Sequence, residues 1–151
     1  MLHQNPFKMA RPAGFTLIEV LVVLVIVMGL ASIVTVNVVR HQAESRVKTA
    51  QLQIVQLEQA LHTFHLDHGR YPTQQQGLEA LIAPPTAPPA VNDYPEGGYL
   101  ARPRLPRDPW GNPYVYLIPG RQEEPFEIIS YGSDGEPGGS GTAAEISSSD
   151  L

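Results

Sequence analysis

The feature that most constrains this chain is an apolar run near its N-terminus. Between Val20 and Val39 lie twenty residues without a charged side chain. At a rise of about 1.5 Å per residue, a helix of that length spans roughly the 30 Å hydrocarbon core of a bilayer. The rest of the 151-residue chain is too small to surround such a helix on every side. A membrane-spanning helix is therefore predicted.

Charge sets the expected orientation of this helix. Lys8 and Arg11 precede the run, whereas the segment after it is polar and net acidic. By the positive-inside rule, the N-terminus is expected in the cytoplasm and the C-terminal part is expected to be exported. The net charge of -5 argues against a nucleic-acid partner, and a chain with no cysteine forms neither a disulfide framework nor a thiolate metal site.

Two residues at the start of the run are unusual. Glu19 is an acid in otherwise apolar sequence, where an unpaired carboxylate would cost several kcal/mol, so it is a candidate for a functional role. Gly14 lies directly before the run and ends a short basic leader. An ordinary secretory signal has its small-residue cleavage site after the apolar region, so this arrangement indicates a different kind of processing.

The segment GFTLIE, residues 14–19, resembles the prepilin peptidase site of type IV pilins and pseudopilins. The resemblance implies cleavage by prepilin peptidase after Gly14 on the cytoplasmic side, N-methylation of Phe15 and retention of the apolar helix. In a filament, the Glu19 carboxylate can pair with the Phe15 amine of a neighbouring subunit, so that each charge finds a partner inside the apolar bundle. A Glu19 side chain that reaches the membrane edge is the alternative.

Beyond the apolar run, the helix is predicted to continue to about Gly69. Apolar residues recur at spacings of three and four and form a one-sided stripe. The stripe consists of Val47, Ala50, Ile54, Leu57, Leu61 and Phe64. The expected organisation is a cleaved leader over residues 1–14, a transmembrane or filament-core helix over 15–39, an amphipathic helix over 40–69, a periplasmic head over 70–131 and a C-terminal loop over 132–151.

The head is expected to be small and rich in turns. A short helix is predicted over Thr73–Ile82, weakened by Gly77 and followed by a proline-rich loop. Runs of β-branched and aromatic residues at Tyr114–Ile118 and Phe126–Tyr131 suit an antiparallel pair of strands. The expected fold is therefore α+β, with a long N-terminal helix packed on a head that contains a short antiparallel sheet, as in type IV pilins.

Two head motifs narrow the resemblance. Residues 71–73 with 76–81, and residues 108–114, resemble the signature of the major pseudopilins of type II secretion systems. This implies a homopolymeric periplasmic pseudopilus that drives export of folded proteins together with minor pseudopilins and an inner-membrane assembly platform. Pro109 and Gly111 are expected to fix a tight turn that delivers Trp110 toward the helix, which is a structural role.

The resemblance also implies a calcium site in the loop over residues 132–145. In the resembled family this loop binds calcium through aspartates and backbone carbonyls, and oxygen-rich loops suit this hard cation. Asp134 matches the family pattern. Residues 141–143 carry no acid where relatives have aspartates, and Glu145 keeps the one carboxylate there. Asp134 and Glu145 are the predicted ligands, and a flexible polar tail is the alternative.

The sequence leaves two other functions to consider, an enzyme and a surface pilin. His62, His65 and His68 offer catalytic potential, but a spacing of three turns each step about 60° around a helix, so the three converge poorly on one metal ion. Solvated histidines are favoured, and no enzymatic activity is expected. A type IV pilin of a surface fibre shares the N-terminal motif, but such pilins commonly close their C-terminal region with a disulfide, which this chain cannot form.

Cleavage between Gly14 and Phe15 is the first testable prediction. Mass spectrometry of the mature protein should find Phe15 as its methylated first residue. The variant Gly14→Val should remain uncut in the membrane, because a small residue lets the backbone enter an active site at the membrane face. Any other first residue in the mature protein would contradict the prediction.

Overall fold

A computed structural model describes residues 14–151, and within residues 31–40 it describes the backbone alone. The basic leader with Lys8 and Arg11 lies outside the described residues. The chain divides into two units, Met1–Arg40 and His41–Leu151. Each unit is considered by itself below.

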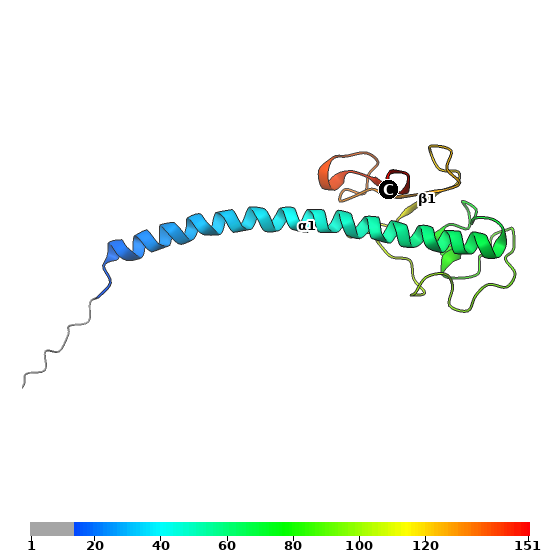
Figure 1. The fold of residues 1–151 in the computed structure, drawn as a ribbon, viewed down its shortest axis with the longest axis horizontal. Coiled ribbons are helices and arrows are strands. Elements are labelled where there is room, and N and C mark those ends of the chain that lie inside the picture. Colours follow the sequence, from blue (N-terminus) through cyan, green and yellow to red (C-terminus); the bar gives the residue numbers. More distant parts are fainter. Residues whose placement is uncertain (1–13) are drawn as a thin grey trace, which may run out of the picture. The chain divides into compact units, whose positions relative to one another are not determined.

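One helix, α1, accounts for most of the secondary structure (Figure 1) and extends over Leu17–His68. It ends where the sequence predicts. Gly69 adopts a left-handed conformation with φ of 71°, and its N–H donates to the carbonyl of His65 at 2.8 Å. Glycine is favoured after a helix C-terminus because it takes this conformation without a Cβ clash.

The described side chains do not complete a membrane span. Among them, no helical stretch is both long enough and apolar enough to cross a bilayer. The predicted span includes residues 31–39, whose side chains lie outside the described part of the chain, and the span stays a prediction.

The predicted apolar stripe of α1 forms one side of the core. Its members Ile54, Leu57, Leu61 and Phe64 are at most 1% exposed. Spacings of three and four keep such residues on one helix face, so the confirmed stripe follows directly from the sequence. Val47, the first predicted member, packs against the core only in part.

The sheet contains the predicted antiparallel pair and one further strand. β1 spans Val115–Leu117, β2 spans Glu127–Ser130, and Tyr116 lies opposite Ile128. β3, Ile146–Ser147, pairs antiparallel with β2, so β2 is the central strand. Each predicted strand is longer than the observed one by one residue at each end. The two residues of β3 carry too little pattern to be recognised in the sequence.

The helix predicted over Thr73–Ile82 is wrong in type and length. Within this range the structure has a short 3-10 helix, η1, at Leu78–Leu81. Gly77 immediately before it has φ of 60°, a left-handed conformation that interrupts any helix begun at Thr73. The shorter element still buries Leu78 and Leu81 in the core.

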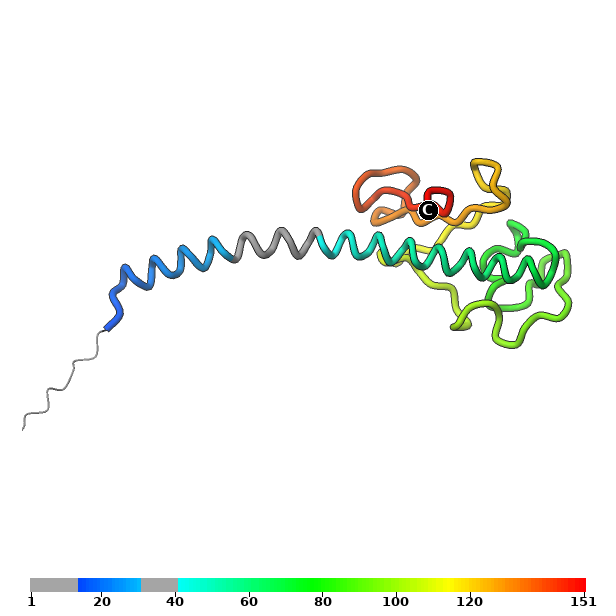
Figure 2. Tube along the Cα trace, in the orientation of Figure 1, coloured from blue at the N-terminus to red at the C-terminus, as the bar shows by residue number. Residues whose placement is uncertain are grey.

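The head closes its core by bringing distant segments onto α1. In Figure 2 the yellow-green loops and the orange-to-red C-terminal segment are drawn on opposite sides of the helix. Tyr116 of β1, Ile128 of β2 and Ile146 of β3 belong to the same buried cluster as the helix stripe. The Tyr116 hydroxyl also donates to the Pro72 carbonyl at 2.8 Å, so the buried phenol has a partner.

The C-terminal segment carries more structure than the predicted loop. It contains the 3-10 helices η2, Gly141–Ala143, and η3, Ser148–Asp150, on either side of β3. Ser147 is buried, and its hydroxyl accepts from the N–H of Ser149 at 3.1 Å at the start of η3. Residues 146–150 therefore belong to the folded head, where β3 pairs with β2.

Truncation of the stripe should destabilise the head strongly. Phe64→Ala should lower the free energy of unfolding by about 3 to 5 kcal/mol, because it removes a fully buried aromatic ring and leaves a cavity. Leu66→Ala on the same helix is the control, since Leu66 is 81% exposed, and it should change stability by less than about 0.5 kcal/mol. Urea unfolding of the full chain in detergent, followed by near-ultraviolet circular dichroism, measures both. Equal losses in the two variants would contradict the assigned core.

Candidate functional site

The predicted cleavage and assembly residues lie at the start of α1. Gly14, Phe15 and Thr16 are exposed and precede the helix. The Thr16 hydroxyl accepts from the backbone N–H of Glu19 at 3.3 Å. Thr16 is thus an N-cap and Glu19 occupies the third helical position, where an acid also interacts favourably with the helix dipole. The sequence interpretation missed this local role of Glu19, although threonine followed three residues later by glutamate is its signature.

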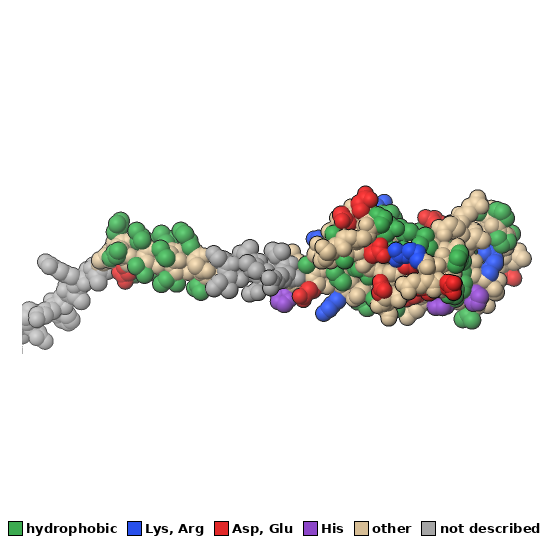
Figure 3. Space-filling view, turned by 90° about the horizontal axis from the view of Figure 1, so that it is seen from above, with side chains coloured by type: hydrophobic (Ala, Val, Ile, Leu, Met, Phe, Trp, Pro, Cys, Tyr) green, Lys and Arg blue, Asp and Glu red, His purple; other side chains and the backbone are tan. Residues whose placement is uncertain are grey.

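Apolar side chains surround the described N-terminal segment of α1. Phe15 is 81% exposed, Leu17 is 87% exposed, and every large hydrophobic residue from there to Leu30 is about half exposed or more. On the face that Figure 3 shows, hydrophobic side chains gather over this segment. A surface that is apolar around the helix is stable only when lipid or other protein covers it.

The C-terminal loop over residues 132–145 is closed by its own backbone. The N–H of Ser133 donates to the carbonyl of Thr142 at 3.0 Å, and the N–H of Glu145 donates to the carbonyl of Gly138 at 3.1 Å. The Asn112 side chain donates to the Gly132 carbonyl at 2.8 Å. Three carbonyl oxygens that could contribute to an ion site therefore already accept hydrogen bonds.

The structure does not join the two predicted calcium ligands into one cluster. Asp134 is exposed and accepts from the backbone N–H of Glu136 at 3.2 Å. Glu145 instead pairs with Arg121, with 2.8 Å between Oε1 and Nη2. No group of three or more acidic, histidine or cysteine side chains able to hold a metal ion occurs in the described part of the chain. Calcium binding by Asp134 and Glu145 stays a prediction.

Arg121 also binds a buried acid that the sequence interpretation missed. Glu127, on the central strand β2, is fully buried, and its Oε1 lies 2.6 Å from Nη2 of Arg121. The Ser147 hydroxyl donates to the same oxygen at 2.6 Å. These hydrogen bonds, of which those from Arg121 have the largest effect, hold the pKa of Glu127 at about 2, below its usual 4.5. Burial has the opposite effect and raises this pKa. Glu127 is therefore a charged carboxylate inside the head.

The turn at Asp108–Asn112 connects the head to the base of the C-terminal loop. The buried Asp108 carboxylate accepts from the backbone N–H of Trp110 at 3.1 Å and of Asn112 at 2.7 Å. Its second oxygen accepts from the Ser130 hydroxyl at 2.7 Å. Trp110 packs against the core only in part, so it buries less apolar area than predicted, and the turn expected from Pro109 and Gly111 is also held by Asp108.

The histidines of α1 do not converge on a common point. The Nδ1 atom of His62 lies 3.0 Å from the Tyr71 hydroxyl, whereas Nε2 of His68 lies 2.7 Å from the Tyr99 hydroxyl. His65 stacks on the Tyr71 ring at 4.4 Å between centroids. The prediction of solvated histidines holds for His62, which is exposed, but His65 and His68 are half-buried and pack on aromatic rings.

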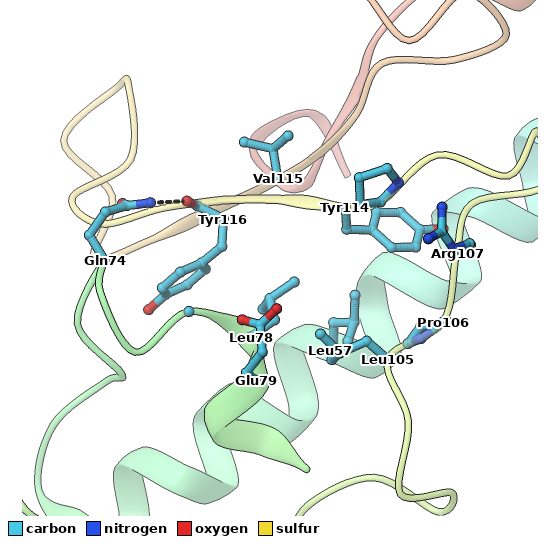
Figure 4. Close-up of a pocket in the computed structure, with 12 residues that line it drawn as sticks. Leu57, Gln74, Leu78, Glu79, Leu105, Pro106, Arg107, Tyr114, Val115 and Tyr116 are labelled. Atoms are coloured by element: carbon cyan, nitrogen blue, oxygen red, sulfur yellow. Dashed lines mark hydrogen bonds between the residues drawn. The ribbon is translucent and has the colours of Figure 1, made fainter. Parts of the chain in front are cut away.

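A pocket of about 480 Å³ lies between β1, η1 and the loop at Leu105–Arg107. Figure 4 shows Leu57 of α1, Leu78 of η1 and Tyr116 of β1 around this space. Glu79 and Arg107 are the charged residues in its lining. The Gln74 amide donates to the carbonyl of Tyr116 at 2.7 Å and accepts from the N–H of Ile118 at 3.1 Å. The Gln74 side chain therefore covers part of the outer edge of β1. The lining does not bring a nucleophile and a base together in the way that catalysis requires.

Comparison with protein families assigns both parts of the chain. A family described as type II secretion system (T2SS), protein G matches residues 37–149. A second, described as a prokaryotic N-terminal methylation motif, matches residues 9–35, which include the predicted cleavage site.

Individual relatives agree with these matches. The type II secretion system core protein G of Vibrio cholerae is 48% identical over 92% of this chain and 92% of its own length. That of Pseudomonas aeruginosa is 44% identical over 90% of this chain and 94% of its own length. A solved major pseudopilin from the type 2 secretion system of enterohaemorrhagic Escherichia coli has a TM-score of 0.65 and is 36% identical, covering 76% of this chain and 96% of that one.

The buried Glu127 makes the free energy of unfolding of the head depend on pH. Its pKa is lower in the folded than in the unfolded chain, so the stabilising effect is complete above about pH 5 and is lost as the pH falls toward 2. Urea unfolding between about pH 6 and about pH 3 should show this loss. The matched variant Glu127→Gln should be less stable near neutral pH but should depend less on pH in that window. Parallel pH profiles for the two proteins would contradict the prediction.

Proposed function

The chain belongs to the protein G family of type II secretion systems, the major pseudopilins, and we propose that it polymerises through its N-terminal helix into the periplasmic pseudopilus that drives export of folded proteins. The observation that carries this proposal is the apolar surface around residues 15–30, which the chain itself leaves exposed. Membrane lipid covers this surface before assembly, and the helices of neighbouring copies cover it in the filament.

Processing by prepilin peptidase precedes assembly in this proposal. The methylation motif, exposed Gly14 and Phe15, and the helix start directly after them support it. A Cβ atom added at Gly14 would meet nothing within 4 Å, so no contact in the described structure requires a glycine there. Recognition by the peptidase is then the reason for the glycine, and the new amine of Phe15 is the product.

Glu19 supplies the partner for that amine. A charged carboxylate among apolar helices is stable only when it is paired. The Thr16 cap fixes Glu19 one turn beyond Phe15 at the start of α1, so the amine of one subunit and the carboxylate of its neighbour lie at similar positions along packed helices. The pair selects the axial register of adjacent subunits.

The location follows from the same features. The N-terminus remains cytoplasmic, the chain crosses the inner membrane once, and the head lies in the periplasm. Minor pseudopilins and the inner-membrane assembly platform are the proposed partners besides further copies of this chain. The basic leader before Gly14 and the acidic remainder of the chain support this orientation.

A structural role is favoured over the two alternatives. In the described residues His62 and His65 contact Tyr71 and His68 contacts Tyr99, an arrangement that does not support an enzyme. A surface type IV pilin shares the methylation motif, but the match over residues 37–149 is to protein G of type II secretion. We therefore propose a non-catalytic subunit of the secretion pseudopilus.

Removal of the Glu19 charge should separate membrane insertion from assembly. Glu19→Gln keeps a capping-box residue at the third helical position but removes the charge, and it should insert normally while assembling at least about tenfold less, because an uncompensated buried amine costs several kcal/mol. Cell fractionation measures insertion, and the yield of sheared, cross-linked filaments measures assembly.

Two further variants distinguish a pairing role of Glu19 from a helix-capping role. Glu44→Gln, on an exposed position of the same helix, should assemble like the wild type. Glu19→Ala, which removes the charge and the capping group, should fail to assemble to a similar extent. Normal assembly of Glu19→Gln together with failure of Glu19→Ala would assign Glu19 to helix capping and refute the pairing role.

A further inference from the structure

The guanidinium of Arg121 lies at the junction of three segments of the head: the turn after β1, strand β2 and the C-terminal loop. It belongs to the turn after β1, and its Nε lies 3.0 Å from both carboxylate oxygens of Glu127 on β2. The backbone N–H of Arg121 donates to Oε2 of Glu127 at 3.0 Å as well. A buried carboxylate is strongly destabilising when it is unpaired, so the head depends on this arginine.

The same guanidinium reaches the C-terminal loop. Its Nη2 bridges Oε1 of Glu127 at 2.6 Å and Oε1 of Glu145 at 2.8 Å. Glu145 is in turn held to the loop, because its second oxygen accepts from the N–H of Gly138 at 3.4 Å and its own N–H donates to the Gly138 carbonyl. One positive charge thereby connects the turn, the central strand and the loop.

These contacts do not fit a calcium ion held by Asp134 and Glu145. Calcium requires six to eight converging oxygen ligands, and its double charge is repelled by a guanidinium bound to one of them. Glu145 pairs with Arg121, and the Asp134 carboxylate accepts a hydrogen bond from the backbone N–H of Glu136. The carbonyls of Gly138 and Thr142 accept backbone hydrogen bonds.

We propose that Arg121, whose side chain is 45% exposed, supplies the cation that takes the place of a bound calcium ion in the head, by neutralising Glu127 and Glu145 and by tying the loop over residues 132–145 to β2. The loop then keeps its fold without metal. This assignment concerns the head alone and holds whether or not the chain polymerises.

Thermal unfolding in the presence of chelator and of millimolar calcium tests the proposal. The full chain in detergent should melt at the same temperature in both. Arg121→Gln should melt lower by about 10 °C or more, because it leaves Glu127 buried without its charged partner. The backbone N–H of residue 121 is retained, so the comparison isolates the guanidinium. The control Arg102→Gln changes an exposed arginine of the same head in the same way and should melt like the wild type.

A second measurement remains informative if Arg121→Gln does not fold. Glu145→Gln removes the outer carboxylate and leaves the pair of Arg121 with Glu127 intact. Limited proteolysis within residues 132–145 should become several-fold faster in this variant, in chelator and in calcium alike. Asp134→Asn, which removes a predicted calcium ligand but keeps an acceptor for the N–H of Glu136, should be cleaved at the wild-type rate.

The opposite pattern would overturn the proposal. If calcium raises the melting temperature of the wild type and slows cleavage of its loop, and if Asp134→Asn abolishes both effects, the loop is closed by the metal. Arg121→Gln that melts like Arg102→Gln would likewise show that the guanidinium does not hold the head together.

Discussion

The apolar stripe of α1 from Ala50 to Phe64 is the surface on which the rest of the head depends. Buried side chains of η1, β1, β2 and β3 all contact this one cluster. The sheet has three short strands and η1 has a single turn, so none of these elements could bury its own apolar side chains alone. The helix therefore acts as the scaffold, and the irregular segments between the strands are held in place by what they bury on it.

The same helix uses apolar residues in a second way at its N-terminus. Between Ala50 and Phe64 the buried apolar residues occupy one face and leave Leu52 and Val55 exposed, whereas between Phe15 and Leu30 the apolar residues lie all round and are exposed. One-sided burial makes a stable folded head, and all-round exposure makes a segment that lipid or other helices must cover. Both behaviours lie on a single continuous element, so the folded head is connected directly to the proposed filament core.

Buried charge gives the head its specific loop arrangement. Asp108 and Glu127 are both buried carboxylates, and each accepts at least one hydrogen bond from another segment. Asp108 organises its own turn and reaches Ser130 of β2, while Glu127 brings Arg121 and Ser147 together. Hydrogen bonds of this kind contribute modest net stability, but an unpaired partner would be costly. They therefore select one loop arrangement among many with similar apolar burial.

The sequence by itself determined the elements whose signals are local. Periodic spacing identified the stripe of α1, Gly69 marked its end, residues 14–19 carried the processing motif, and runs of β-branched and aromatic residues indicated β1 and β2. It did not identify β3, the limited extent of η1 or the pairing of Arg121 with Glu127 and Glu145. A two-residue strand has no periodicity, the φ of Gly77 is set by the turn it completes, and Arg121 and Glu145 are 24 residues apart. Only the tertiary structure decides such contacts, because a charge is paired by the segments that the core brings near it, and those segments meet only after α1 has buried its stripe.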